Sequence, residues 1–335
     1  MKKLRARIFG ISLEEATFGR RGFPECDERL RLRLESIGKT FLTGYLAALD
    51  VDGHDDLRRR LEEVDLERRG FAYEGAGMAL ALMDMLLPWK RNRWRTFVEG
   101  PAAAHDYMMN VGLGWALARM HRRVERTLER LDPLIGWLAL DGYGFHEGYF
   151  KWKSVIVHHH VPSRLKGYAR RVFDQGVGRS LWFVEGADVR RIAHTIGRFP
   201  AARHADLWAG VGLASAYAGG TDEEAIRLLA ELSGEHRPAL AQGVVFACET
   251  RRKVGNIATH TALASRVICG MPVETAADIA IEEREKLPRD RELPAYEVWR
   301  IRIQSHFLPE GDGRGAATSH LQVQDYHDSR SVPNE

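Results

Sequence analysis

Apolar side chains recur three and four positions apart along most of this chain, which is the spacing of amphipathic helices. Residues 28–69 keep this spacing and carry charged residues at the intervening positions. Further helices are predicted over residues 74–87 and 102–131, each of which ends close to a proline. The apolar run 75–87 is too short to cross a membrane and contains an aspartate, so we expect a buried helix there.

The second half of the chain continues the helical pattern. Helices are predicted over residues 187–196, 205–218, 258–267 and 273–285, and another begins at the capping sequence Thr221-Asp222-Glu223-Glu224. Residues 296–308 alternate apolar and polar positions, and they fit a short strand as well as a last helix. The tail, residues 309–335, has no periodic apolar pattern, and we expect it to be disordered.

Two segments of the chain resemble each other in sequence. Residues 70–150 recur, more loosely, at residues 181–255, and Gly112 in the first copy corresponds to Gly212 in the second. Self-similarity of this kind is the signature of repeat architectures. We therefore predict a mainly α protein in which two tandem copies of one helical unit pack as a solenoid or toroid-like body.

This duplication divides the chain into segments. We expect an N-terminal helical lead-in (residues 1–69), a first helical repeat (70–153), a connecting segment (154–180), a second helical repeat (181–255), C-terminal helices (256–308) and the tail (309–335). The connecting segment begins with Ser154-Val155-Ile156-Val157 and continues into three histidines and a Val-Pro pair. A residue before proline favours extended backbone, so an extended linker is predicted between the copies.

Charge is nearly balanced along the chain. There are 49 lysine and arginine residues against 46 acidic residues, and the formal net charge is +3. A nucleic-acid-binding domain normally carries a clear basic excess, so this class of protein is disfavoured. The basic clusters at residues 90–95, 190–191 and 251–253 lie beside helical apolar patterns, and we interpret them as solvated faces.

The three cysteines, Cys26, Cys248 and Cys269, are an odd number and lack the paired spacing of a zinc site. A disulfide framework is also disfavoured, and reduced thiols indicate a cytoplasmic protein. No hydrophobic stretch near the N-terminus has the length of a signal peptide. Cys248 follows an apolar segment, Val244-Val245-Phe246-Ala247, so it is predicted to be a buried thiol rather than a nucleophile.

A Phe-x-Glu-Gly sequence occurs at residues 97–100, 145–148 and 183–186, and at 71–75 with one residue inserted. One interpretation is structural, because glycine permits close packing and a glutamate covers free N–H groups at a helix start. The alternative is functional: some of these glutamates could lie beside His105, His146 or His204 in an interior cleft, where burial would raise the glutamate pKa toward neutrality and suit acid–base catalysis. The candidate acid–base residues are Glu147, His146, Glu74, Glu185, His105 and His204.

Histidine and aspartate recur together in the two copies, at His105-Asp106 and at His204-Ala205-Asp206. These groups could converge on one ligand between the copies, but no Glu-x-x-His pair, typical of metal-binding helical bundles, lies near them. Adjacent residues of an extended chain do not all face one ion, so the run His158-His159-His160 is better explained as a solvated linker. We predict no metal site, and the sequence names no cofactor.

Aromatic residues are concentrated in and near the two copies. Many must fill the core, but helices with small residues on one face and aromatic residues on the other can enclose an apolar tunnel. Such a tunnel suits a conjugated or lipid-like ligand. The aromatic residues expected to contact this ligand are Tyr107, Trp115, Tyr143, Tyr149, Trp182 and Trp208.

Motifs for nucleophilic catalysis and for nucleotide binding are missing from the sequence. There is no Gly-x-Ser-x-Gly elbow and no glycine-rich phosphate loop after a predicted strand. Gly75-Ala76-Gly77 and Gly112-Leu113-Gly114 lie inside helical patterns instead. Close helix packing explains glycines in such positions.

Four longer stretches carry a resemblance to a known family: residues 8–23, 74–79, 138–150 and 173–183. They resemble a bacterial family labelled as a domain of unknown function, best known from the UnbL-type proteins encoded beside enediyne polyketide synthases. The resemblance spans roughly residues 4–305. It implies a cytoplasmic accessory protein of antibiotic biosynthesis that acts where a synthase-made polyene becomes an enediyne core, and it assigns no catalytic residue.

Two functional hypotheses follow. In the first, which is narrowly favoured, the protein is an enzyme that modifies the polyene, with the candidate acid–base residues arranged around an apolar tunnel. In the second, it is a non-catalytic binder or chaperone that shields the polyene or docks on the polyketide synthase. Both make an apolar conjugated ligand the partner, neither involves nucleic acid or insertion in a membrane, and a homo-oligomer stays open.

Overall fold

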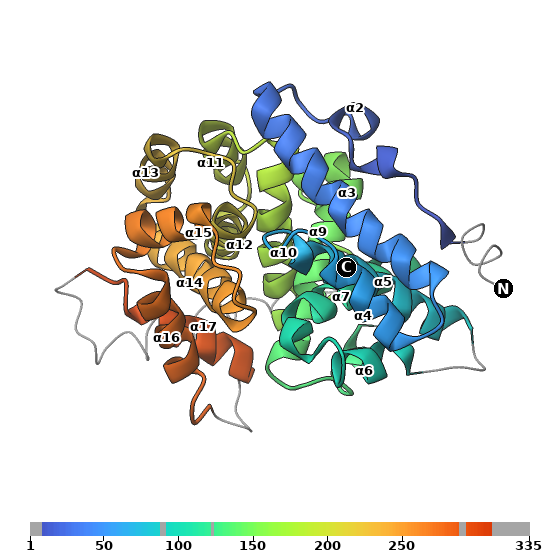
Figure 1. The fold of residues 1–335 in the computed structure, drawn as a ribbon. Coiled ribbons are helices and arrows are strands. Elements are labelled where there is room, and N and C mark those ends of the chain that lie inside the picture. The colour runs from blue at the N-terminus through green and yellow to red at the C-terminus, as the bar shows by residue number, and fades with distance from the viewer. Residues whose placement is uncertain (1–8, 88–91, 122–123, 288–292, 310–335) are drawn as a thin grey trace, which may run out of the picture.

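The computed structural model describes residues 9–87, 92–121, 124–287 and 293–309 (Figure 1). Within these ranges every regular element is a helix, and none is a strand. The long helices are α3 (Glu28–Asp50), α5 (Arg69–Leu86), α7 (Asp106–Met120), α9 (Leu138–Phe150), α10 (Tyr168–Val184), α12 (His204–Tyr217) and α14 (Arg237–Lys253). The remaining α-helices are α2 (Phe18–Arg21), α4 (His54–Glu62), α6 (Arg93–Val98), α8 (Glu125–Leu128), α11 (Val189–Gly197), α13 (Glu223–Leu232), α15 (Thr259–Ala264), α16 (Val273–Glu283) and α17 (Ala295–Ser305).

The long helices pack in chain order, from α3 against α5 to α12 against α14. Short helices return the chain between them. At the end of α5, the Asp84 carboxylate accepts hydrogen bonds from the N–H groups of Arg93 and Trp94, which begin α6. Near the start of α5, the Tyr73 ring stacks on His105, which precedes α7. Because α6 runs back along α5, helices α5 and α7 point in the same direction.

Glycines set the spacing between the long helices. A Cβ atom on Gly75 of α5 would lie 1.9 Å from the carbonyl oxygen of Phe41 in α3, and one on Gly77 would lie 3.0 Å from that of Met109 in α7. The same arrangement, one glycine toward the preceding helix and one toward the next, recurs at Gly112 and Gly114, Gly142 and Gly144, Gly176 and Gly178, and Gly210 and Gly212. Only a residue without a Cβ permits this approach of two backbones. The prediction that Gly-x-Gly serves helix packing is confirmed.

This recurrence involves one helix at a time in five successive helices, rather than two copies of a larger unit. Gly112 and Gly212, matched in the sequence comparison, contact different neighbours: Gly112 faces the preceding helix α5, and Gly212 faces the following helix α14. The division into two tandem copies therefore stays a prediction, and the contacts that recur in the structure belong to single helices.

The far end of the helix row contacts its beginning. Arg251 in α14 donates a hydrogen bond to the carbonyl oxygen of Glu67, just before α5, and another to that of Tyr217 in α12. Arg33 in α3 donates to the carbonyl oxygen of Ala218. Arg251 is completely buried, so the interpretation of residues 251–253 as a solvated face is wrong at this position. Its guanidinium group fastens the two ends of the row together.

Three predicted elements differ in the structure. The helix expected over residues 102–131 is interrupted, because α7 ends where His121 adopts a positive φ of 51°. The expected extended linker after residue 153 is instead a π-helical turn, η4 (Lys153–Val157), which buries two apolar side chains, and α10 begins at Tyr168. Residues 296–305 lie in helix α17, and no strand forms over 296–308, because the large apolar side chains Tyr296, Trp299 and Ile303 recur at helical spacing and are buried.

Other predictions agree with the structure or lie outside it. The apolar run 75–87 falls in α5, most of which is buried, as expected. Residues 310–335 of the tail and residues 90–91 of the first basic cluster lie outside the described residues. None of the described helices combines the length and the apolar character needed to cross a membrane.

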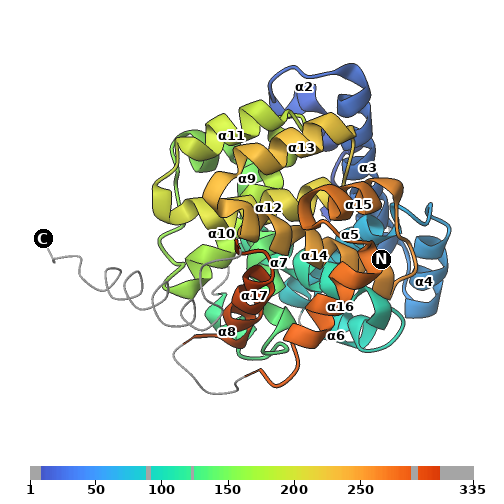
Figure 2. The same ribbon diagram turned by 90° about the vertical axis from the view of Figure 1, so that its left-hand side faces the viewer.

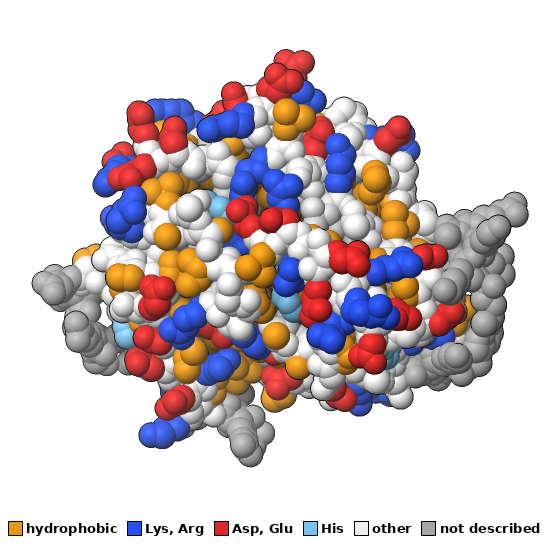
Figure 3. Space-filling model, viewed as in Figure 1, with side chains coloured by type: hydrophobic (Ala, Val, Ile, Leu, Met, Phe, Trp, Pro, Cys, Tyr) orange, Lys and Arg blue, Asp and Glu red, His pale blue; other side chains and the backbone are white. Residues whose placement is uncertain are grey.

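The short helices and the charged side chains cover the outside of the molecule. Helices α11 and α13 lie side by side on one face, as Figure 2 shows. On the face seen in Figure 3, acidic and basic side chains are interspersed rather than gathered into a region of one sign. The interior of the fold contains a cavity bordered by several of the long helices.

Candidate functional site: an aromatic cavity with a buried carboxyl group

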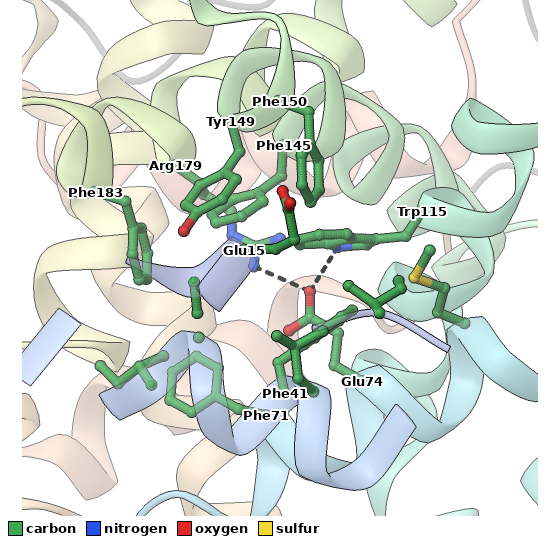
Figure 4. A pocket seen from close by; sticks show the side chains of 16 residues that line it. Glu15, Phe41, Phe71, Glu74, Trp115, Phe145, Tyr149, Phe150, Arg179 and Phe183 are labelled. Carbon is green, nitrogen blue, oxygen red and sulfur yellow. Dashed lines mark hydrogen bonds and ion pairs between the residues drawn. The ribbon is translucent and has the colours of Figure 1, made fainter. Parts of the chain in front are cut away.

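A narrow cavity lies on the inner side of helices α3, α5, α7, α9 and α10. It encloses about 610 Å³ of space not filled by atoms, with its open mouth included. Its walls are Ile11, Glu15, Ala16, Ile37, Gly38, Phe41, Leu42, Phe71, Glu74, Met78, Trp115, Phe145, Tyr149, Phe150, Arg179 and Phe183 (Figure 4). Apolar and aromatic walls with few polar groups are typical of small-molecule sites.

The N-terminal segment forms one wall of the cavity. Its backbone is held at two points: the Tyr45 hydroxyl donates to the carbonyl oxygen of Phe9 at 2.7 Å, and the Phe18 N–H donates to the buried Glu35 carboxylate at 3.0 Å. The Phe23 ring also meets the Tyr149 ring edge to face, with 5.0 Å between centroids. Sequence analysis did not connect this segment with a site, although Ile11, Glu15 and Ala16 line the cavity.

Aromatic rings surround the cavity centre. The Trp115 indole lies 4.3 Å from the Phe41 ring and 5.2 Å from the Phe145 ring, measured between centroids. The Phe145 and Tyr149 rings are stacked nearly parallel at 5.9 Å, and Phe183 meets Phe145 edge to face. Rings in this arrangement offer flat faces and edges to a planar ligand.

The carboxyl group of Glu74 enters this aromatic space. Glu74 is 3% exposed, and its Oε1 accepts a hydrogen bond of 2.9 Å from the Trp115 indole N–H. Burial raises the pKa of Glu74 to about 7, although the nearby Arg179 and the Trp115 hydrogen bond act in the opposite direction. A group with this pKa is protonated and deprotonated in comparable amounts near neutral pH, which suits acid–base work.

A buried network holds Arg179 beside Glu74. One guanidinium nitrogen of Arg179 pairs with the Asp141 carboxylate, and another lies 3.9 Å from Glu74 Oε1. The second oxygen of Asp141 accepts a hydrogen bond of 2.7 Å from Gln175, which in turn donates to the Tyr296 hydroxyl. These contacts join α9, α10 and α17, so Arg179 is fixed by packing that is distant in sequence from Glu74.

Three of the predicted site residues meet in the cavity: Glu74, Trp115 and Tyr149. His146 and Glu147 lie on the same helix as Tyr149 but outside the cavity walls. Both oxygens of Glu147 accept hydrogen bonds from Lys151, at 3.0 and 2.9 Å. Burial acts to raise the pKa of Glu147, but hydrogen bonds from His146 and Lys151 outweigh it, and the pKa is lowered.

The other predicted acid–base residues are separated from the cavity and from each other. His105 stacks on Tyr73, and burial lowers its pKa to about 4. His204 lies near the carbonyl oxygen of Phe199, and Glu185 accepts a hydrogen bond from Thr195 just after the end of α10. The expected convergence of His105 and His204 on one ligand is not found. Glu185 also follows a helix end, so the proposed role of this motif at helix starts is wrong there.

The other predicted aromatic residues serve contacts elsewhere. The hydroxyl groups of Tyr107 and Tyr143 accept hydrogen bonds from Arg284 and Arg164, respectively. The indole of Trp182 donates to the carbonyl oxygen of Gly219. Trp208 lines a second, more polar hollow together with His204 and His236. In the structure, these aromatic rings do not form a continuous tunnel with the cavity.

Metal ligands do not cluster in the part of the chain that is described: no three histidine, cysteine, aspartate or glutamate residues there are placed to hold an ion. In the run His158-His159-His160, the middle ring packs on Phe199 with 4.3 Å between centroids, and the other two are exposed. Cys248 is fully buried, which confirms the predicted burial of this thiol, and burial raises its pKa to about 12.

Sequence reasoning missed Arg179 and most of the apolar wall, including Phe41 and Phe71. The available signal for Arg179 was a single arginine among small and apolar residues, Val177-Gly178-Arg179-Ser180-Leu181. A charged residue in such a setting is buried and paired, or it serves a ligand.

Together, these features define an all-helical protein with an aromatic-lined cavity that contains an ionisable carboxyl group. The chain belongs to the family described as "Protein of unknown function (DUF1702)", whose profile matches residues 1–307. No curated protein and no solved structure matches the chain.

Proposed function

We propose that this protein is an accessory protein of enediyne polyketide biosynthesis that takes up a synthase-derived conjugated polyene in the cavity, where Glu74 exchanges a proton with it. The observation that carries the proposal is the placement of one buried carboxyl group, with a pKa near neutrality, among aromatic rings. The resemblance of the chain to UnbL-type proteins supplies the polyene as the ligand.

The lining of the cavity suits such a ligand in polarity. It is narrow and bordered by Phe41, Trp115, Phe145 and Phe183, which suits a slender chain with delocalised electrons better than a sugar or nucleotide. The Glu74 carboxyl group lies next to this path, with the Trp115 hydrogen bond fixing its orientation. Transfer of the Glu74 proton to one carbon, followed by removal of a proton from another carbon by the resulting carboxylate, shifts the double bonds without an oxidant, a reductant or a metal.

The proposal is tested with the polyene released by an enediyne polyketide synthase, incubated in heavy water with and without the purified protein. Absorbance spectra follow the conjugation, and mass spectrometry follows deuterium incorporation. We expect a changed spectrum and incorporated deuterium with the wild-type protein, and loss of both with Glu74→Gln. Glu147→Gln is the matched control, because Glu147 lies outside the cavity and should be dispensable.

The second candidate function is non-catalytic binding, favoured by the aromatic wall alone. A protein that only shields the polyene would lengthen its lifetime without deuterium incorporation, and Glu74→Gln would preserve that protection. Substitution of cavity aromatic residues such as Phe183→Ala would then abolish it. If the polyene neither changes nor survives longer in the presence of the protein, both functions are excluded.

A further inference from the structure

Glu74 and Arg179 both line the cavity and carry polar atoms that lack a hydrogen-bond partner in the described part of the chain. Among the described residues, Glu74 Oε2 receives no hydrogen bond, and only one nitrogen of Arg179 donates one, to Asp141. The distance of 3.9 Å from Arg179 to Glu74 Oε1 is too long for a hydrogen bond. Figure 4 shows both side chains among the aromatic rings of the cavity.

Arg179 is only 6% exposed, so its remaining N–H groups have few alternatives to a ligand. A buried N–H group of a charged side chain that has no acceptor lowers the stability of the folded protein. A guanidinium group forms strong hydrogen bonds with carboxylate and carbonyl oxygens. Asp141 cannot satisfy these donors alone, because one of its oxygens is already occupied by Gln175.

We infer that the cavity selects a conjugated chain with a terminal oxygen acceptor, a carboxyl or carbonyl group, and that Arg179 and Glu74 bind this oxygenated end. The inference rests on the proposed function, in that it takes the apolar chain as the ligand and specifies its head group. The chain lies along the aromatic wall, while its head group accepts hydrogen bonds from Arg179 and from the protonated Glu74.

A carboxylate head group links binding to the protonation of Glu74. The charged groups that act on Glu74 are Arg179 from α10 and Asp141 from α9, while α3 and α7 present Phe41 and Trp115, and the Tyr217 hydroxyl lies on α12. The N-terminal segment adds Glu15 to the cavity wall, where its carboxylate is paired with Arg20 and Arg21. One arginine already paired with Asp141 does not neutralise two further carboxylates. Glu74 must therefore be protonated when a carboxylate binds, and affinity for the acid falls as the pH rises above about 7.

The test measures binding of parinaric acid, a fluorescent conjugated tetraene with a terminal carboxyl group, to the full-length protein. Its methyl ester and the corresponding alcohol, which replaces the carboxyl group with a hydroxymethyl group, are the comparison ligands. We expect the acid to bind roughly 10- to 100-fold more tightly than the alcohol at pH 6, the range of a hydrogen bond to a charged group. The methyl ester distinguishes a carboxyl from a carbonyl head group. If the ester binds as tightly as the acid, a neutral carbonyl group is sufficient for recognition by Arg179 and Glu74.

Variants of the protein then test which residues cause the preference for the acid over the alcohol. The double variant Arg179→Met with Asp141→Asn removes both members of the ion pair and should bind acid and alcohol equally, while Asp141→Asn alone keeps Arg179 and should keep the preference. Glu74→Gln, made with Arg179 and Asp141 unchanged, should abolish the pH dependence of acid binding. Equal affinity of the wild-type protein for all three ligands overturns the head-group inference but supports a site for the chain. Failure of all three to bind overturns the proposed function itself.

Discussion

The glycine contacts between the long helices give a quantitative prediction for Gly212→Ala. A Cβ atom at residue 212 would lie 2.0 Å from the carbonyl oxygen of Leu240, whereas ordinary contact begins at 3.4 Å, so α12 and α14 must move apart by about 1.4 Å. Adding a methyl group to a well-packed core costs typically ~1–3 kcal/mol, occasionally more. Because the opposing atom is backbone and cannot rotate away, we expect the free energy of unfolding to fall by about 3 kcal/mol.

The matched control is Gly197→Ala. Gly197 is the last residue of α11, and a Cβ atom there would meet nothing within 4 Å. Alanine is favoured over glycine in a helix by roughly 0.5–1 kcal/mol, so this variant should be as stable as the wild-type protein or slightly more stable. Urea denaturation followed by circular dichroism measures both. Equal stability of the two variants would refute the argument that backbone contact at glycine sets the helix spacing.

Three further predictions concern buried groups. Because the pKa of Glu74 is raised to about 7 in the folded state, ionisation of this group opposes folding. Its contribution to the free energy of unfolding is complete below about pH 4.5 and is lost as the pH rises to about 7. Over that interval, urea titrations should show the wild-type protein losing about 3 kcal/mol of stability relative to Glu74→Gln. Arg300→Met removes the buried partner of the Asp206 and Glu297 carboxylates and should lower the free energy of unfolding by about 3–5 kcal/mol. Arg266→Met, at an exposed ion pair, should lower it by less than about 0.5 kcal/mol, and similar values for both variants would contradict the structure. Iodoacetamide at about pH 8 should alkylate the partly exposed Cys26 in the folded protein and leave Cys248 unmodified, as peptide mass spectrometry would show; early modification of Cys248 would count against its burial.

Part of the cavity was predictable from local sequence. Glu74 stands between apolar and small residues of a strongly helical segment, so its burial follows from the pattern around it. Trp115 and Tyr149 were found because large aromatic residues near glycines indicate enclosed space. The histidine candidates failed for a different reason: their recurrence in sequence carried no information about which face of each helix they occupy.

The remaining cavity residues depend on contacts between distant segments. Arg179 reaches Glu74 only because α9 and α10 pack closely through Gly144 and Gly176, which brings Asp141 into contact with its guanidinium group. The N-terminal wall depends on hydrogen bonds to Glu35 and Tyr45, whose side chains come from α3. The spacing of apolar residues along the sequence does not predict which of these distant segments contact each other.

The sequence by itself therefore determined the helical class, the position of most helices and the use of Gly-x-Gly for close packing, because periodicity and the lack of a Cβ are local properties. Only the tertiary structure decided that the glycine contacts recur helix by helix, that Arg251 is buried, and that residues 296–305 are helical. It also decided which of many glutamates and aromatic rings share a cavity. Glu74 and Trp115 are 41 positions apart, and the environment that raises the pKa of Glu74 exists only when five helices and the N-terminal segment enclose it.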